Sequence, residues 1–151
     1  MAFGVLAGAV QFVGLARWPF LAPYLADTYL DPQASPEARE AAAVTFQAFQ
    51  NYAGGALGEH LGYLFTAVWT LLLAAGLVRV IGRPWLAGLG AVIALGIAAG
   101  MAEPLLEAAG TVNAVAYSAW ALWLVIVGVL LLRVKKDAHA PAPPQVGGAG
   151  A

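Results

Sequence analysis

The sequence contains no cysteine and few charged residues. Of its 151 residues, 10% are charged, against about 25% in a typical soluble domain. The lack of cysteine excludes disulfides, thiolate metal sites and cysteine nucleophiles, and the formal net charge of −1 offers no basic surface for nucleic acid. Hydrophobic residues make up 62% of the chain, and the mean hydropathy is +0.79. Because so little polar surface cannot cover a water-soluble body, the composition predicts an integral membrane protein.

Several runs of the sequence are long and apolar enough to cross a bilayer, which takes about 20 mainly apolar residues. The first run contains Arg17 and is expected to bend near Pro19, where a backbone donor is missing. A signal peptide is the alternative for this run. However, the run lacks the basic start of a signal peptide, and its apolar character continues beyond Arg17. The predicted spans are about 3–24, 61–78, 85–102 and 108–132.

The basic residues predict how these spans are oriented. Arg79 and Arg83 lie in one short loop, and Arg133, Lys135 and Lys136 follow the last span. Under the positive-inside rule both segments belong in the cytoplasm, and the two spans between them place them on the same side. All acidic residues except one then fall on the opposite side. We therefore predict an all-α, four-helix membrane bundle with both termini in the cytoplasm.

The segment 36–53 is predicted as an external helix lying at the membrane interface. Residues 41–58 are uncharged, but Gln47, Gln50 and Asn51 interrupt the apolar run. A fifth span here would also leave almost no room to turn before the next one. The external interpretation is therefore preferred to a further crossing.

The two ends of this external helix are not equally clear. Ser35 followed by Pro36 is a good start signal, with a capping hydroxyl and a proline in the first turn. At the other end, the helix either breaks at Gly54 and Gly55 or continues into the next span. Residues 138–151 are rich in proline and glycine and are predicted to form a disordered cytoplasmic tail.

Small residues recur at every fourth position in several predicted helices, a spacing typical of close helix packing in membranes. These small residues are Gly4 and Gly8; Gly54, Gly58 and Gly62; Gly96 and Gly100; and Gly110, Ala114 and Ser118.

Three tryptophans, Trp69, Trp120 and Trp123, lie deep in their spans. They are interpreted as packing residues rather than as a pigment or quinone site.

Polar residues near the outer ends of the spans form the candidate site. An ionisable group inside a membrane costs at least about 2.5–3.5 kcal/mol and usually has a partner. Arg17 is the clearest case, because it lies within a span and fits no loop. The predicted topology brings four acidic or histidine residues to a similar level: Glu59, His60, Glu103 and Glu107. Asn113 and Tyr117 lie deeper in the last span and complete the candidate site.

This cluster has two interpretations. It can bind a ligand head group, relay protons or hold a metal. Alternatively, Arg17 forms a structural ion pair with one carboxylate while the other residues face water at the helix ends. The structural interpretation is preferred, because long basic side chains can extend to the membrane interface.

No catalytic or metal-binding motif is present: there is no HExxH, no Glu-x-x-His, no nucleophile elbow and no phosphate-binding loop. We assign no catalytic residue, metal site or cofactor. The leading hypothesis is a non-enzymatic membrane protein that serves as an accessory subunit of a larger complex. The second is a small transporter or a lipid- or quinone-binding protein, and an enzyme is the least supported. The expected partners are the lipid bilayer and either another membrane protein or a second copy, with no nucleic acid.

Three stretches carry a recognisable pattern: residues 14–21 (GLARWPFL), 46–49 (FQAF) and 58–66 (GEHLGYLFT). Weaker matches lie at Glu103 with Pro104 and at Asn113 with Tyr117. Together they resemble a family of bacterial multi-pass membrane proteins known only as a domain of unknown function, DUF4386. The resemblance implies a bacterial cytoplasmic membrane and supplies no activity. Members of that family carry further helices before this region, which leaves open whether this chain is a shortened member.

Overall fold

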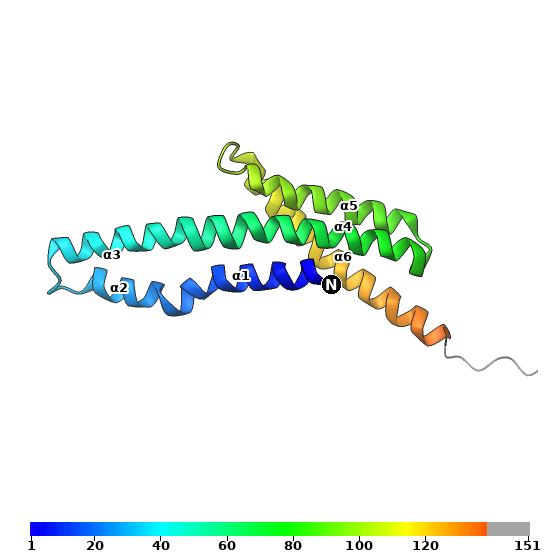
Figure 1. Ribbon diagram of the computed structural model, residues 1–151, viewed down its shortest axis with the longest axis horizontal. Coiled ribbons are helices and arrows are strands. Elements are labelled where there is room, and N and C mark those ends of the chain that lie inside the picture. The colour runs from blue at the N-terminus through cyan, green and yellow to red at the C-terminus, as the bar shows by residue number, and fades with distance from the viewer. Residues whose placement is uncertain (139–151) are drawn as a thin grey trace, which may run out of the picture.

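A computed structural model describes residues 1–138, which are almost entirely helical and contain no strand. The helices are α1 (Ala2–Phe20), α2 (Ala22–Leu30), α3 (Pro36–Phe49), α4 (Gly62–Ile81), α5 (Pro84–Ala99) and α6 (Ala108–Ala138) (Figure 1). A π-helix, η1 (Gln50–Leu61), joins α3 to α4, and a short 3-10 helix, η2 (Gly100–Ala102), follows α5. The tail predicted over 138–151 lies outside the described residues, apart from Ala138.

Four stretches within the described residues are long and apolar enough to cross a membrane: Ala2–Leu30, Pro36–Ile81, Pro84–Ala102 and Ala108–Arg133. Each contains one of the predicted spans. The all-α membrane bundle predicted from the sequence is therefore confirmed.

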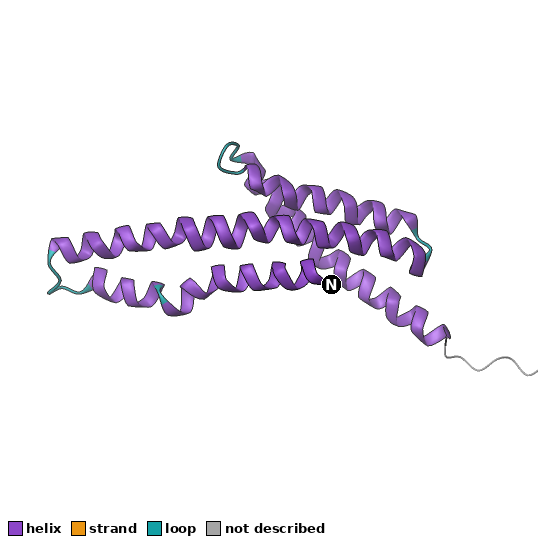
Figure 2. Ribbon diagram, in the orientation of Figure 1, coloured by secondary structure: helices purple, strands orange, loops and turns teal. Residues whose placement is uncertain are grey.

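α1 and α2 form one bent rod (Figure 2). Pro19 lies inside the last turn of α1, and Pro23 lies in the first turn of α2. A proline in a helix lacks the N–H donor and its ring pushes against the preceding turn, so two prolines four residues apart separate the rod at Leu21. The bend lies where Pro19 predicts it.

α3, η1 and α4 form a single continuous helix of 46 residues. At about 1.5 Å per residue it is roughly 70 Å long, more than twice the roughly 30 Å hydrocarbon core of a bilayer. It begins at Ser35, whose side chain accepts a hydrogen bond from the Ala38 N–H at 3.3 Å. It ends at Gly82, which adopts a left-handed conformation with φ +66° that favours glycine.

The structure therefore answers the question about Gly54 and Gly55: the helix does not break there. It passes through both residues as the π-helix η1. The helix expected over 36–53 is present, and of the two possibilities for its end, the structure has the one in which it continues into α4 (Figure 1).

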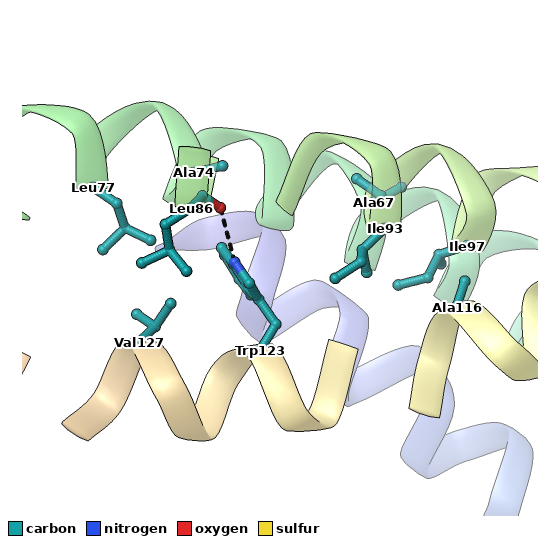
Figure 3. Close-up of a cluster of buried hydrophobic side chains, with 10 residues drawn as sticks. Ala67, Ala74, Leu77, Leu86, Ile93, Ile97, Ala116, Trp123 and Val127 are labelled. Atoms are coloured by element: carbon teal, nitrogen blue, oxygen red, sulfur yellow. Dashed lines mark hydrogen bonds between the residues drawn. The ribbon is translucent and has the colours of Figure 1, made fainter. Parts of the chain in front are cut away.

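The core lies between α4, α5 and α6 (Figure 3). Trp123 of α6 is 1% exposed, and its Nε1 donates to the Leu86 carbonyl at 2.9 Å. Its ring lies against Gly90 of α5, where an added Cβ would come within 2.6 Å of it. An added Cβ at Gly96 would similarly come within 2.7 Å of Ala116. Small residues on α5 thus allow α6 to approach closely.

α1 packs in the opposite direction to α4 and is displaced along it. Gly14 of α1 lies against Gly58 of η1, and Gly4 lies against Trp69, partway along α4. α1 consequently covers η1 and only the adjoining part of α4, while α2 and α3 extend beyond the α5–α6 turn (Figure 1). The first predicted span is therefore offset from the other three instead of lying level with them.

The Gly14 contact provides a test of this packing. An added Cβ at Gly14 would lie 2.7 Å from the Gly58 Cα and 2.8 Å from the Ala53 carbonyl oxygen, both backbone atoms. We expect Gly14→Ala to destabilise the protein by about 1–3 kcal/mol, the usual cost of overpacking. Gly8→Ala is the matched control on the same helix, because nothing lies within 4 Å of its added Cβ. It should leave stability unchanged or raise it by up to about 1 kcal/mol.

Thermal unfolding in one detergent, followed by circular dichroism, measures both variants. Equal melting temperatures for Gly14→Ala and Gly8→Ala would contradict the close approach of α1 to η1.

Candidate functional site

The structure separates the predicted site residues into groups. Arg17, Glu59 and Tyr117 line one cavity of about 230 Å³ between α1, η1 and α6, which we call the Arg17 cavity. His60 and Glu103 line a larger, open cleft of about 700 Å³ between η1 and the α5–α6 turn, together with Glu59. We call it the His60 cleft. Its remaining lining residues are Asn51, Gly55, Ala56, Leu57, Leu61, Tyr63, Gly100 and Pro104.

Two predicted site residues line neither space. Glu107 is exposed in the α5–α6 turn. Asn113 is only 5% exposed, and its Nδ2 donates to the Ile97 carbonyl of α5 at 2.8 Å. Its side chain also packs against Gly100. Asn113 therefore connects α6 to the end of α5 by a buried hydrogen bond. Among the described residues, no three His, Asp or Glu side chains gather closely enough to hold a metal ion.

Arg17 is half-buried, and its hydrogen bonds go to neutral groups. Its Nε donates to the Gln50 Oε1 at 2.8 Å, and its Nη1 donates to the Gly14 carbonyl. The guanidinium lies against Gly54, where an added Cβ would come within 2.8 Å of it. Its Cζ is also 5.2 Å from the centre of the Trp18 ring. This differs from the ion pair with a carboxylate that the structural interpretation expected.

Gln11 is the site residue that the sequence analysis missed. Its Nε2 donates to the Thr66 Oγ1 at 3.3 Å and to the Tyr117 Oη at 3.1 Å. Gln11 thus joins α1 to α4 and α6, and its side chain lies over Gly62, where an added Cβ would be within 2.9 Å. The available signal was a single amide in an otherwise apolar helix, which usually needs a partner in a membrane.

Four aromatic side chains on α4 and α6 form a row that begins at the Arg17 cavity. The centres of the Tyr63 and Tyr117 rings are 5.7 Å apart, and those of Tyr117 and Trp120 are 5.9 Å apart. Trp69 and Trp120 are also separated by 5.9 Å. The Trp120 Nε1 donates to the Thr70 Oγ1 at 2.9 Å, which satisfies its polar atom. These contacts agree with the packing role expected for Trp69 and Trp120.

The inner two rings form the wall of an apolar groove of about 360 Å³ between α1, α4 and α6, which we call the α1–α6 groove. Gln11 and Thr66 contribute an amide and a hydroxyl to its lining. Gln11 also lines the Arg17 cavity, so this side chain borders both spaces. The groove is lined by Met1, Gly4, Val5, Ala7, Gly8, Gln11, Thr66, Trp69 and Trp120.

The fold and this arrangement define the class: an all-α protein with four helices long and apolar enough to cross a membrane. The chain belongs to the family described as Domain of unknown function (DUF4386), which matches residues 1–128. The resemblance noted from the sequence is thereby confirmed. No curated protein and no solved structure matches the chain. The family description names no activity, so the geometry of this chain is what bears on its function.

The structural role of Asn113 leads to a prediction. We expect Asn113→Ala to destabilise the protein by about 1–3 kcal/mol, because it leaves the buried Ile97 carbonyl without this donor. Ser118→Ala on the same helix is the control, since its hydroxyl bonds the Ala114 carbonyl at an exposed position. The control should change stability by no more than about 0.5 kcal/mol. Thermal unfolding in detergent measures both, and an Asn113→Ala variant as stable as the control would show that this contact does not hold α6.

Proposed function

We propose that this chain binds a membrane lipid, with the head group in the Arg17 cavity and an apolar chain in the α1–α6 groove. The observation that carries the proposal is that the two spaces are neighbours, with Gln11 as a lining residue of both. A cavity lined by the Arg17 guanidinium therefore lies next to an apolar groove, which is the polarity pattern of an amphipathic ligand. Ligand sites in proteins combine mostly apolar walls with a few polar groups that fix the ligand's orientation.

The depth of the two spaces supports a lipid as the occupant. Arg17 lies over Gly54 of η1, and the next residue, Gly55, lines the His60 cleft with the end of α5, a level at which we expect lipid head groups. Gly4 and Trp69 lie at the far end of the groove. From Arg17 to Gly4 the helix rises roughly 20 Å at about 1.5 Å per residue. Half of a roughly 30 Å hydrocarbon core is about 15 Å, so the two spaces together match a head group and one leaflet of acyl chain.

The charge distribution supports an orientation for the chain. Arg79, Arg83 and Arg133 lie at one end of the bundle formed by α4, α5 and α6, and Glu103 and Glu107 lie at the other. By the positive-inside rule the arginine end faces the cytoplasm of a bacterial cell. The Arg17 cavity then belongs to the outer leaflet, the N-terminal end of α1 points toward the cytoplasm, and the C-terminal end of α6 lies there.

A second candidate function, an accessory subunit of a membrane complex, is supported by the surface of α2 and α3. These helices extend beyond the α5–α6 turn and expose large apolar side chains, among them Tyr24, Tyr29, Leu30, Val44 and Phe49. Exposed apolar patches of this kind commonly mark interaction surfaces. Purification from native membranes tests it: a stable companion chain is expected, and an isolated monomer would argue against a subunit role.

A steric block of the α1–α6 groove tests lipid binding. Gly8 lines the groove and is exposed, and nothing lies within 4 Å of an added Cβ, so Gly8→Phe adds a ring at the groove from a position without close neighbours. We expect it to lower the amount of copurifying lipid at least about tenfold. Gly76→Phe is the matched control, since Gly76 is an equally open position on α4 outside the groove. Native mass spectrometry and lipid extraction measure the bound lipid, and equal amounts in the two variants would contradict the proposed site.

A further inference from the structure

We infer that the lipid head group is zwitterionic, with a phosphate held at Arg17 and a primary ammonium held at Glu59, as in phosphatidylethanolamine. This inference rests on the proposed lipid site and names its ligand class. It is carried by the presence of one guanidinium and one carboxylate on the walls of the same cavity of about 230 Å³.

The phosphate position follows from the geometry of Arg17. A guanidinium has five N–H donors, and the hydrogen bonds to Gln50 and Gly14 use two of them. The other three donors include both of those on Nη2. A planar group of this kind recognises a phosphate through paired hydrogen bonds. Gln50 and Gly14 also hold the side chain in place, so a ligand does not have to order it.

The ammonium position follows from Glu59. This residue is half-buried and lies on η1, on the wall shared by the Arg17 cavity and the His60 cleft. A carboxylate in a partly apolar setting is stabilised by a cation within hydrogen-bond reach. Tyr63 and Tyr117 line the same cavity with rings 5.7 Å apart, and the faces of such rings attract cations at about 6 Å.

These charges distinguish three classes of membrane lipid. A phosphatidylglycerol head group would place its phosphate at Arg17 but has no cation for Glu59, which would repel its charge. A phosphatidylcholine head group carries a cation without N–H donors, so it cannot hydrogen-bond the carboxylate. A phosphatidylethanolamine head group satisfies both residues, because its phosphate is an anion for Arg17 and its ammonium is a cation with N–H donors for Glu59.

The apolar groove favours the intact lipid over its free head group. The Arg17 cavity and the α1–α6 groove share Gln11 as a lining residue, so a lipid with its head group in the cavity would place its acyl chain at the neighbouring groove. Free phosphoethanolamine would fill the cavity and leave the groove empty, without the favourable burial of apolar surface.

The test uses the full chain, purified in a lipid-free detergent and given equimolar phosphatidylethanolamine and phosphatidylglycerol, with native mass spectrometry as the readout. We expect the unaltered protein to prefer phosphatidylethanolamine by at least about tenfold. Glu59→Gln keeps the size of the side chain and removes its charge, so it should bind lipid with the preference abolished or reversed. Glu107→Gln is the matched control, because Glu107 lines neither space, and it should retain the preference. A further arm adds free phosphoethanolamine, which should compete only weakly.

The outcomes separate the two proposals. Lipid binding that Gly8→Phe blocks, but that shows no preference for phosphatidylethanolamine or keeps its preference in Glu59→Gln, overturns the zwitterion inference and leaves the lipid site standing. Absence of lipid binding by the folded, unaltered protein overturns both. Free phosphoethanolamine binding as well as the lipid does would overturn the lipid as the source of the head group. Circular dichroism of each variant confirms that it is folded before its lipid binding is compared.

Discussion

The close contact between Gly14 of α1 and Gly58 of η1 determines the position of the other residues in the candidate site. Neither residue has a Cβ, and an added one at Gly14 would collide with backbone atoms of η1. In a membrane, where little hydrophobic drive brings helices together, such close approach is a common basis of packing. Once Gly14 lies against Gly58, the helical repeat places Gln11 over Gly62 and Arg17 over Gly54. One backbone contact thus sets both polar anchors of α1.

The same contact explains why a groove exists. α1 and α6 both pack on α4, and a hydrogen bond from Gln11 to Tyr117 joins them. Below that bond, Gly4 lies against the Trp69 indole, whereas nothing lies within 4 Å of an added Cβ at Gly8. Both glycines line the groove, and a large side chain at Gly8 would occupy part of it. Gly14 and Gly4 therefore allow α1 to approach closely at two points, and the open space lies between them beside Gly8.

Local signals predicted much of the fold, because each of them acts within a few residues. Pro19 predicts the bend, Ser35 predicts the start of α3, and the arginines predict which ends of α4, α5 and α6 lie together. The continuity of the helix through Gly54 and Gly55 was not predictable from local signals, since paired glycines are compatible with a break. Gly54 packs against Arg17, from a helix distant in the sequence.

The partners of the polar residues depend in the same way on how far α1 is displaced along η1 and α4. With the spans level, a carboxylate is the natural partner for Arg17, and a lone Gln11 offers no indication of its partners on α4 and α6. The displacement instead brings Arg17 to Gln50 and Gln11 to Thr66 and Tyr117. Sequence patterns located the cluster, but the register between distant helices determines which side chains form hydrogen bonds with each other.

The choice of a neutral partner for Arg17 has a consequence for function. A direct ion pair with Glu59 would neutralise both charges and use their hydrogen-bonding capacity, which would leave the cavity with little to offer a ligand. Gln50 and the Gly14 carbonyl orient the guanidinium while keeping its full charge. Placing an arginine at the edge of a membrane costs free energy. Neutral partners offset only part of that cost, so an anion that bound Arg17 would lower it further. The proposed lipid site therefore depends on Arg17 and Glu59 lining one cavity without Arg17 using its hydrogen bonds on a carboxylate.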